Sequence, residues 1–192
     1  MRTTRAMRKL GADLLAAARL APNTDAPGII GGLCAAYGRG RDRDRDRDRP
    51  VLFRFAAFPP DTASGLWLEM EDRDLLVIEE RTRPEHQLVI ACHELWHLDE
   101  GTCDRHGEGM AVAARLTGRG GGLAELLHSE EGLSTVLRQA AARADGSDPA
   151  EIRAETFGLH LGKILKTFLP PPREEQVPEA IERIKTSFGC GR

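Results

Sequence analysis

The segment His93-Glu94-Leu95-Trp96-His97 restricts the fold of this chain more than any other feature of the sequence. Residues i and i+4 of an α-helix point the same way, so His93 and His97 can bind one zinc ion if the segment is helical. Glu94 then lies beside the metal, where it can accept a proton from a water molecule. The motif predicts a helix with two zinc ligands, His93 and His97, and a general base, Glu94.

The residues around the motif favour this helix. Thr82, followed by Pro84 and Glu85, is typical of a helix start, with Thr82 as the cap and Glu85 completing a capping box. We expect the helix to run to about residue 99 and to end near Gly101. Its apolar stripe is predicted to consist of Leu88, Ala91, Cys92, Leu95 and Leu98.

A catalytic zinc site needs a third protein ligand and an open position for water. Cys103 is one candidate, although the metzincin arrangement has a glycine at position 100 and a histidine at position 103, where this chain has Glu100 and Cys103. His106 is another, if the segment that follows the helix folds back. His86 lies two turns before His93, which is too far to share the metal with both histidines.

Glu151 and Glu155 provide a further alternative on a helix predicted over about 149–168. In gluzincin-type sites, which this pair resembles, a downstream helix contributes a ligand glutamate. An acidic group one turn later hydrogen-bonds a zinc histidine and fixes its tautomer. Helical glutamates are more often solvated charges, so the residues alone leave the third ligand open between Glu151, Cys103 and His106.

The rest of the pattern predicts an α+β fold with helices first and a small sheet next. The sequence favours N-terminal helices at 5–20 and 25–38, strands at 51–58, 65–71 and 74–80, and further helices at 123–143 and 174–187. The last two strands are predicted to form a hairpin that turns at Asp72-Arg73, so we expect a small three-stranded, mainly antiparallel sheet. No internal repeat or boundary divides residues 1–192, which indicates a single domain.

Composition limits the partners. The net charge is −3 over 192 residues, which gives no general attraction to nucleic acid or to an anionic membrane. The Arg-Asp repeat at 39–49 balances its own charges and is interpreted as a low-complexity surface insertion. Asp13 and Arg19 interrupt the apolar N-terminal stretch, so we expect no signal peptide and a cytoplasmic protein with free thiols.

The chain resembles the ImmA/IrrE-type metallopeptidases, including short actinobacterial forms often labelled as toxin components of toxin–antitoxin systems. The resemblance covers about residues 7–165. It is carried by His93-Glu94-x-x-His97, by Glu151-x-x-Ala154-Glu155-x-Phe157-Gly158, and by the lead-in from Gly65 to Leu98. Two positions depart from the family pattern. Trp96 replaces a usual glycine, which would crowd the packing beside the metal, and Arg153 replaces a frequent Glu or Gln.

The resemblance implies a zincin-like fold in which Zn²⁺ is bound by His93, His97 and Glu151, while Glu155 supports one of the histidines. It also implies a metallopeptidase that cleaves a protein partner, such as a DNA-binding repressor or an antitoxin. The alternative is a toxin–antitoxin component or regulatory binding module that keeps a zincin fold without peptidase activity.

Overall fold

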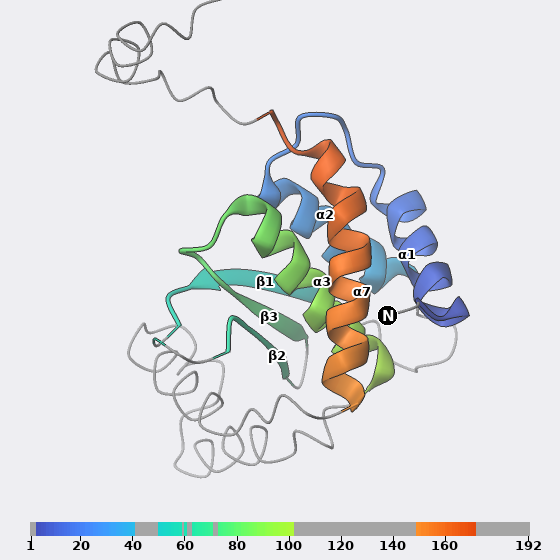
Figure 1. Cartoon of the computed structure of the whole chain (residues 1–192), viewed down its shortest axis with the longest axis vertical. Helices are drawn as coiled ribbons and strands as arrows, with labels where there is room; N and C mark the ends of the chain where they lie inside the picture. Colours follow the sequence, from blue (N-terminus) through green and yellow to red (C-terminus); the bar gives the residue numbers. More distant parts are fainter. Residues whose placement is uncertain are drawn as a thin grey trace, which may run out of the picture.

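The structure, a computed structural model, describes residues 3–40, 50–58, 60, 63–70, 73–101 and 149–171. Its elements are the helices α1 (Arg5–Ala18) and α2 (Ala26–Gly40), the strands β1 (Val51–Ala56), β2 (Gly65–Glu69) and β3 (Asp74–Glu79), the helices α3 (Pro84–Glu100) and α7 (Pro149–Leu165), and a short 3₁₀ helix (Lys166–Phe168). Over these described residues the chain has the mixed α+β arrangement that the sequence predicts, with four α-helices and one small sheet (Figure 1).

The sheet has the order β1-β3-β2, with β3 in the centre. β2 and β3 form the predicted antiparallel hairpin, whereas β1 runs parallel to β3 over six residue pairs. The prediction of a mainly antiparallel sheet is therefore wrong, because β1 pairs with the second strand of the hairpin and not with β2. Leu76, Val77 and Ile78 of β3 are fully buried, as expected of a central strand covered on both faces.

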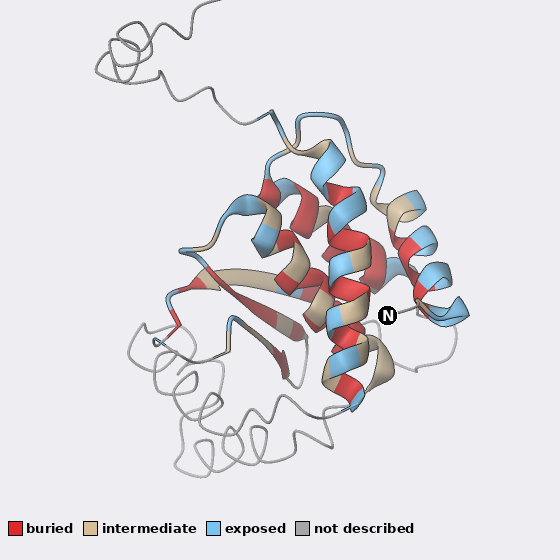
Figure 2. Cartoon of the chain, in the orientation of Figure 1, coloured by how far each residue is buried: buried red, intermediate tan, exposed pale blue. Residues whose placement is uncertain are grey.

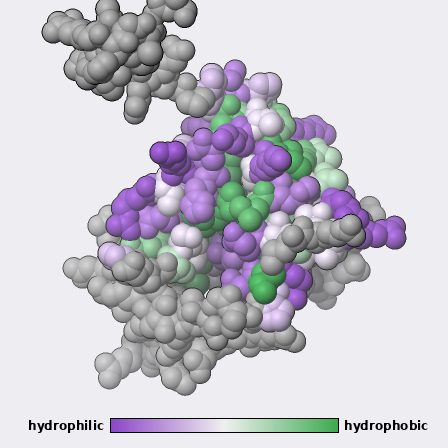
Figure 3. Space-filling view, viewed as in Figure 1, coloured by the Kyte–Doolittle hydropathy of each residue, from purple (hydrophilic) through white to green (hydrophobic). Residues whose placement is uncertain are grey.

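The main hydrophobic core lies between the sheet and the helices (Figure 2). α2 contacts β1, α3 contacts β2 and β3, and α7 packs along α3. The predicted apolar stripe of α3 is confirmed, since all five of its residues are buried. The small residues of α7 are buried, whereas Ile152, Leu159 and Ile164 are exposed. Figure 3 shows hydrophilic surface interrupted by hydrophobic areas on the face of the molecule seen in Figure 1.

The ends of α3 are set by two residues with restricted backbones. Pro84 lies in the first turn, as predicted, and is the first helical residue. Gly101 ends the helix in the left-handed conformation (φ 62°), with its N–H donating to the carbonyl of His97. The predicted capping box is wrong. Arg83 occupies the cap position without a side-chain bond, and the Thr82 hydroxyl donates instead to the Glu79 carbonyl at 3.2 Å.

Several predicted features lie outside the described residues. They are the helices at 123–143 and 174–187 and positions 41–49 of the Arg-Asp repeat, whose first two residues, Arg39 and Gly40, belong to α2. Within the described ranges, no helix combines the length and apolar character that crossing a membrane requires.

Glu79, at the end of β3, holds the entrance to α3 in place. Its carboxylate accepts hydrogen bonds from the Phe58 N–H, the Arg81 N–H and the Arg81 guanidinium, each at 2.8–2.9 Å. The Arg81 side-chain bond lowers the pKa of Glu79 to about 2 in spite of burial, and the two backbone N–H groups add to the effect.

This shift makes stability depend on pH in the acid range. The folded pKa of Glu79 lies near 2 and below its ordinary value of 4.5, so the unfolded chain takes up the proton first as pH falls. The stabilisation is present above pH 4.5 and is lost as pH falls towards 2. Glu79→Gln should lower the unfolding free energy at pH 7 by about 2 kcal/mol. Urea denaturation of Glu79→Gln between pH 7 and 2 should also show an unfolding free energy that falls less steeply with falling pH than that of wild type. An unchanged pH dependence would contradict the role assigned to Glu79.

Candidate metal centre

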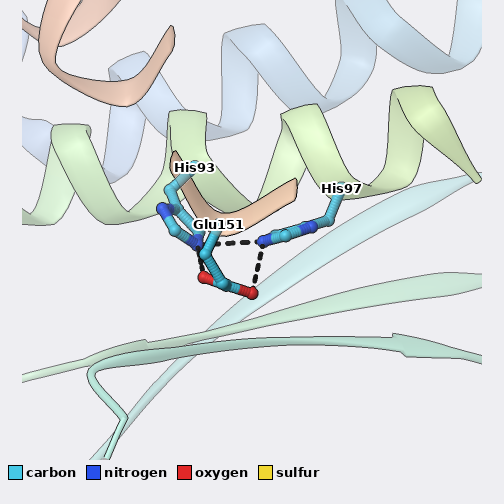
Figure 4. Close-up of side chains that lie close together, drawn as sticks. All are labelled: His93, His97 and Glu151. Carbon is cyan, nitrogen blue, oxygen red and sulfur yellow. Dashed lines mark hydrogen bonds and ion pairs between the residues drawn. The ribbon is translucent and has the colours of Figure 1, made fainter. Parts of the chain in front are cut away.

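His93, His97 and Glu151 bring their side chains together where α3 meets the start of α7 (Figure 4). The two histidine Nε2 atoms lie 3.0 Å apart. The Glu151 carboxylate places one oxygen 3.2 Å from Nε2 of His93 and the other 3.3 Å from Nε2 of His97. Figure 4 shows both imidazoles leaving α3 on the same side, with the carboxylate directed at both.

This spacing fits a small divalent ion. For bonds of about 2.0–2.1 Å in tetrahedral geometry, neighbouring ligand atoms lie about 3.3 Å apart. The two Nε2 atoms, 3.0 Å apart, are close to that value, and each lies 3.2 or 3.3 Å from a different oxygen of Glu151. One donor atom from each of the three residues lies within 4.8 Å of the other two. The His93, His97 and Glu151 group could therefore hold a metal ion, with His97 buried and the other two partly open to solvent. Of the three residues predicted as a possible third ligand, Glu151 alone lies within the described residues, and it brings a third donor to the two histidines.

The carboxylates around His93 change its proton affinity. Burial acts to lower the pKa of His93, but the hydrogen bond to Glu151 and the charges of Glu94, Glu151 and Glu155 outweigh burial and raise it. A cation at this position replaces a proton on the imidazole. Metal binding should therefore release protons and strengthen as pH rises.

Glu151 reaches the histidines because α7 approaches α3 very closely. A Cβ atom at Gly158 would lie 2.8 Å from the carbonyl oxygen of Val89, and one at Gly162 would lie 2.7 Å from the Val89 side chain. The contact with Val89 is to backbone at Gly158, so it cannot be relieved by a side-chain rotation. The missing side chains of Gly158 and Gly162 thus set the distance between the two helices.

Glu94 is buried on the side of α3 that faces the sheet. A Cβ atom at Gly65, the first residue of β2, would lie 2.5 Å from Glu94 Oε1 and 2.5 Å from Ile90 Cγ2. The Glu94 carboxylate therefore occupies the space that a side chain at position 65 would need. Sequence reasoning placed Glu94 beside the metal ligands but had no signal for the role of Gly65.

Glu155 lies on the other side of His93 from the metal donors. Its Oε2 atom is 3.8 Å from Nδ1 of His93, while Nε2 of the same ring faces Glu151. This is an ion-pair distance and longer than a hydrogen bond. The predicted support of a histidine by Glu155 stays a prediction, and the histidine that Glu155 approaches is His93.

Two other predicted candidates, Cys103 and His106, lie outside the described residues. His86, which the spacing already excluded, is exposed in the first turn of α3. Trp96 is buried against Phe157 of α7, with ring centroids 5.0 Å apart. Sequence reasoning also missed the ion pair between Arg153 and Glu100, since it treated Arg153 only as a departure from a family pattern.

No family model, curated protein or solved structure matches the chain in the three comparisons made. The described fold and site by themselves define an α+β protein with a three-residue candidate metal centre.

The close helix contact gives a test of how Glu151 is positioned. Gly158→Ala must push α7 away from the Val89 carbonyl, so we expect a loss of about 1–2 kcal/mol in unfolding free energy despite the higher helix propensity of alanine. Metal affinity should fall as well, because Glu151 moves with α7. Urea denaturation of the metal-free protein and a metal titration measure the two effects.

Gly11→Ala in α1 is the matched control. A Cβ atom there meets only ordinary contacts, 3.6 Å to Leu161 and 3.8 Å to Phe157. This variant should gain about 0.5–1 kcal/mol from helix propensity and keep wild-type metal affinity. Equal changes in unfolding free energy and metal affinity in the two variants would show that the spacing of α3 and α7 does not determine the position of Glu151.

Proposed function

We propose that this protein is a zinc-dependent metallopeptidase of zincin-like fold. The observation that carries the proposal is the convergence of His93 Nε2, His97 Nε2 and the Glu151 carboxylate at 3.0–3.3 Å, beside the buried Glu94 of an HExxH helix. Zinc is preferred over other ions because two imidazoles and one carboxylate are the donor set of His₂Glu catalytic zinc sites. Three protein donors leave a fourth position open for water.

The residues divide the chemistry between them. Zn²⁺ held by His93, His97 and Glu151 would supply Lewis acidity, which lowers the pKa of a water molecule and polarises a peptide carbonyl. Glu94 takes the proton of that water and passes it to the amine nitrogen as the peptide bond breaks. Burial of Glu94 against Gly65 limits its movement, which favours repeated proton transfer at one place.

Glu155 is assigned an orienting role. A carboxylate near Nδ1 of His93 favours the tautomer with the proton on Nδ1 and leaves Nε2 as the metal donor. Glu155 is largely exposed and lies 3.8 Å away, so its contribution to affinity should be smaller than that of Glu151.

The substrate class rests on the resemblance of the two motifs to the ImmA/IrrE-type family. It favours regulatory cleavage of a protein partner, such as a DNA-binding repressor or an antitoxin, in the cytoplasm. The alternative is a toxin–antitoxin component or binding module without peptidase activity. It shares the metal centre, but its function does not need Glu94 as a base.

The decisive variant is Glu94→Gln. Wild type should carry about one zinc per chain by elemental analysis. Glu94→Gln should keep that zinc and lose cleavage by a factor of about 100 or more, because the amide cannot accept the proton. Cleavage is followed by mass spectrometry of a peptide library incubated with the zinc-loaded protein.

The outcomes separate the competing functions. A native protein that neither contains nor takes up zinc would overturn the metal assignment. Zinc retention with full cellular function in Glu94→Gln would favour the binding module. Glu151→Ala should weaken zinc binding far more than Cys103→Ser does, and the reverse order would move the third ligand to Cys103.

Gly65→Ala tests the base without touching a metal ligand. The new methyl group displaces the Glu94 carboxylate, so we expect cleavage to fall by about 100-fold. The zinc dissociation constant, measured by chelator competition, should stay within about 3-fold of wild type, because Gly65 has no part in the ligand set. Unchanged cleavage would mean that Glu94 does not act from its position against β2.

A further inference from the structure

A two-pronged ion pair joins α3 to α7 close to the metal ligands. Arg153 Nε lies 2.7 Å from Glu100 Oε1, and Arg153 Nη2 lies 3.0 Å from Glu100 Oε2. The planar guanidinium and the carboxylate thus form two nearly parallel hydrogen bonds. This geometry restrains both distance and rotation, unlike a single contact between flexible charges.

The pair is next to the site on both helices. Glu100 follows His97 by one turn on α3, and Arg153 follows Glu151 by two residues on α7. The Glu100 side chain is 21% exposed and that of Arg153 39% exposed, so water screens the pair only in part. A change in this contact would move the backbone that carries Glu151.

The position of Glu100 is unfavourable for α3 itself. It is the last residue of the helix, where the unpaired carbonyl groups carry partial negative charge and a carboxylate is disfavoured. The bond to Arg153 offsets that repulsion. The pair therefore contributes chiefly to the junction of the two helices, and less to the stability of α3.

A second ion pair at the opposite end of the same helices provides an internal comparison. Lys166 Nζ lies 3.8 Å from Glu85 Oε1, with side chains 64% and 37% exposed. Lys166 is about 22 Å from Glu151 along the chain of α7 and the 3₁₀ helix. This pair is single, exposed and distant from the metal ligands, so it should matter little to them.

We propose that the Glu100–Arg153 ion pair is a positioning element that sets where Glu151 meets the two histidines, and thereby sets metal affinity. The proposal rests on the proposed zinc centre. Arg153 and Glu100 do not touch the metal in it, and act only by holding the start of α7 against the end of α3.

The test is a thermodynamic cycle in zinc affinity, measured by chelator competition on the full chain. Arg153→Ala is made in the wild-type background and in a Glu151→Ala background. If the pair acts through Glu151, Arg153→Ala should weaken zinc binding about 10-fold or more in the first background and less than about 2-fold in the second. A general loss of structure would weaken binding equally in both.

Four further variants complete the experiment. Lys166→Ala, the matched control, should leave zinc affinity within about 2-fold of wild type. Glu100→Arg combined with Arg153→Glu restores an ion pair of opposite sense and should recover most of the affinity that Arg153→Glu alone loses. Arg153→Lys keeps the charge but not the fork, and gives an intermediate loss that can be measured if Arg153→Ala does not fold.

Co²⁺ absorption supplies an independent readout, since its visible bands report the geometry of the ligands and not the stability of the protein. Arg153→Ala should alter these bands and Lys166→Ala should not.

Equal losses of zinc affinity in both backgrounds, or no loss in either, would overturn the positioning role while leaving the zinc peptidase proposal standing. If the cycle gives the expected zinc affinities but the protein cleaves no peptide, the positioning role is supported and the peptidase proposal is overturned. Absence of zinc binding in wild type would overturn both.

Discussion

The candidate site depends on how closely α7 packs against α3. Ala150, Ala154, Gly158 and Gly162 recur at four-residue intervals along the buried side of α7, so no large side chain separates the two backbones there. At this separation the short side chain of Glu151 reaches both histidines. A Cβ atom at Gly158 would meet the Val89 carbonyl and the backbone N and Cβ of His93, so the interhelical distance is tied to a residue of the candidate metal centre.

The charges at this junction, like its packing, favour a positive ion between the two helices. Glu94, Glu151 and Glu155 all raise the pKa of His93 through their charge, which means that the site attracts positive charge of any kind. A proton relieves part of this field, and a divalent cation bound by three donors relieves more of it. Glu94 is buried, with only 7% of its surface exposed, so little solvent screens its charge from His93. His93, His97 and Glu151 could hold such a cation.

Much of this site could be predicted from sequence because its spacing is local. His93, Glu94 and His97 share one helix, whose start at Pro84 and end at Gly101 are fixed by backbone chemistry. Glu151 could be chosen only with the help of a resemblance. The parallel pairing of β1 with β3, the space for Glu94 at Gly65 and the Glu100–Arg153 pair could not be predicted. Each depends on contacts between elements distant in the chain, for which periodicity and capping rules carry no signal.

Trp96 shows how one helix can serve the core and the site together. At about 100° per residue, His93 and His97 lie between Trp96 on one side and Glu94 on the other. Trp96 packs on Phe157 of α7, whereas Glu94 lies against Gly65 of β2. The bulk of Trp96 therefore lies at the junction of α3 and α7, on the side of the helix opposite Glu94. Trp96 thus belongs to the same helix contact that brings Glu151 to the two histidines.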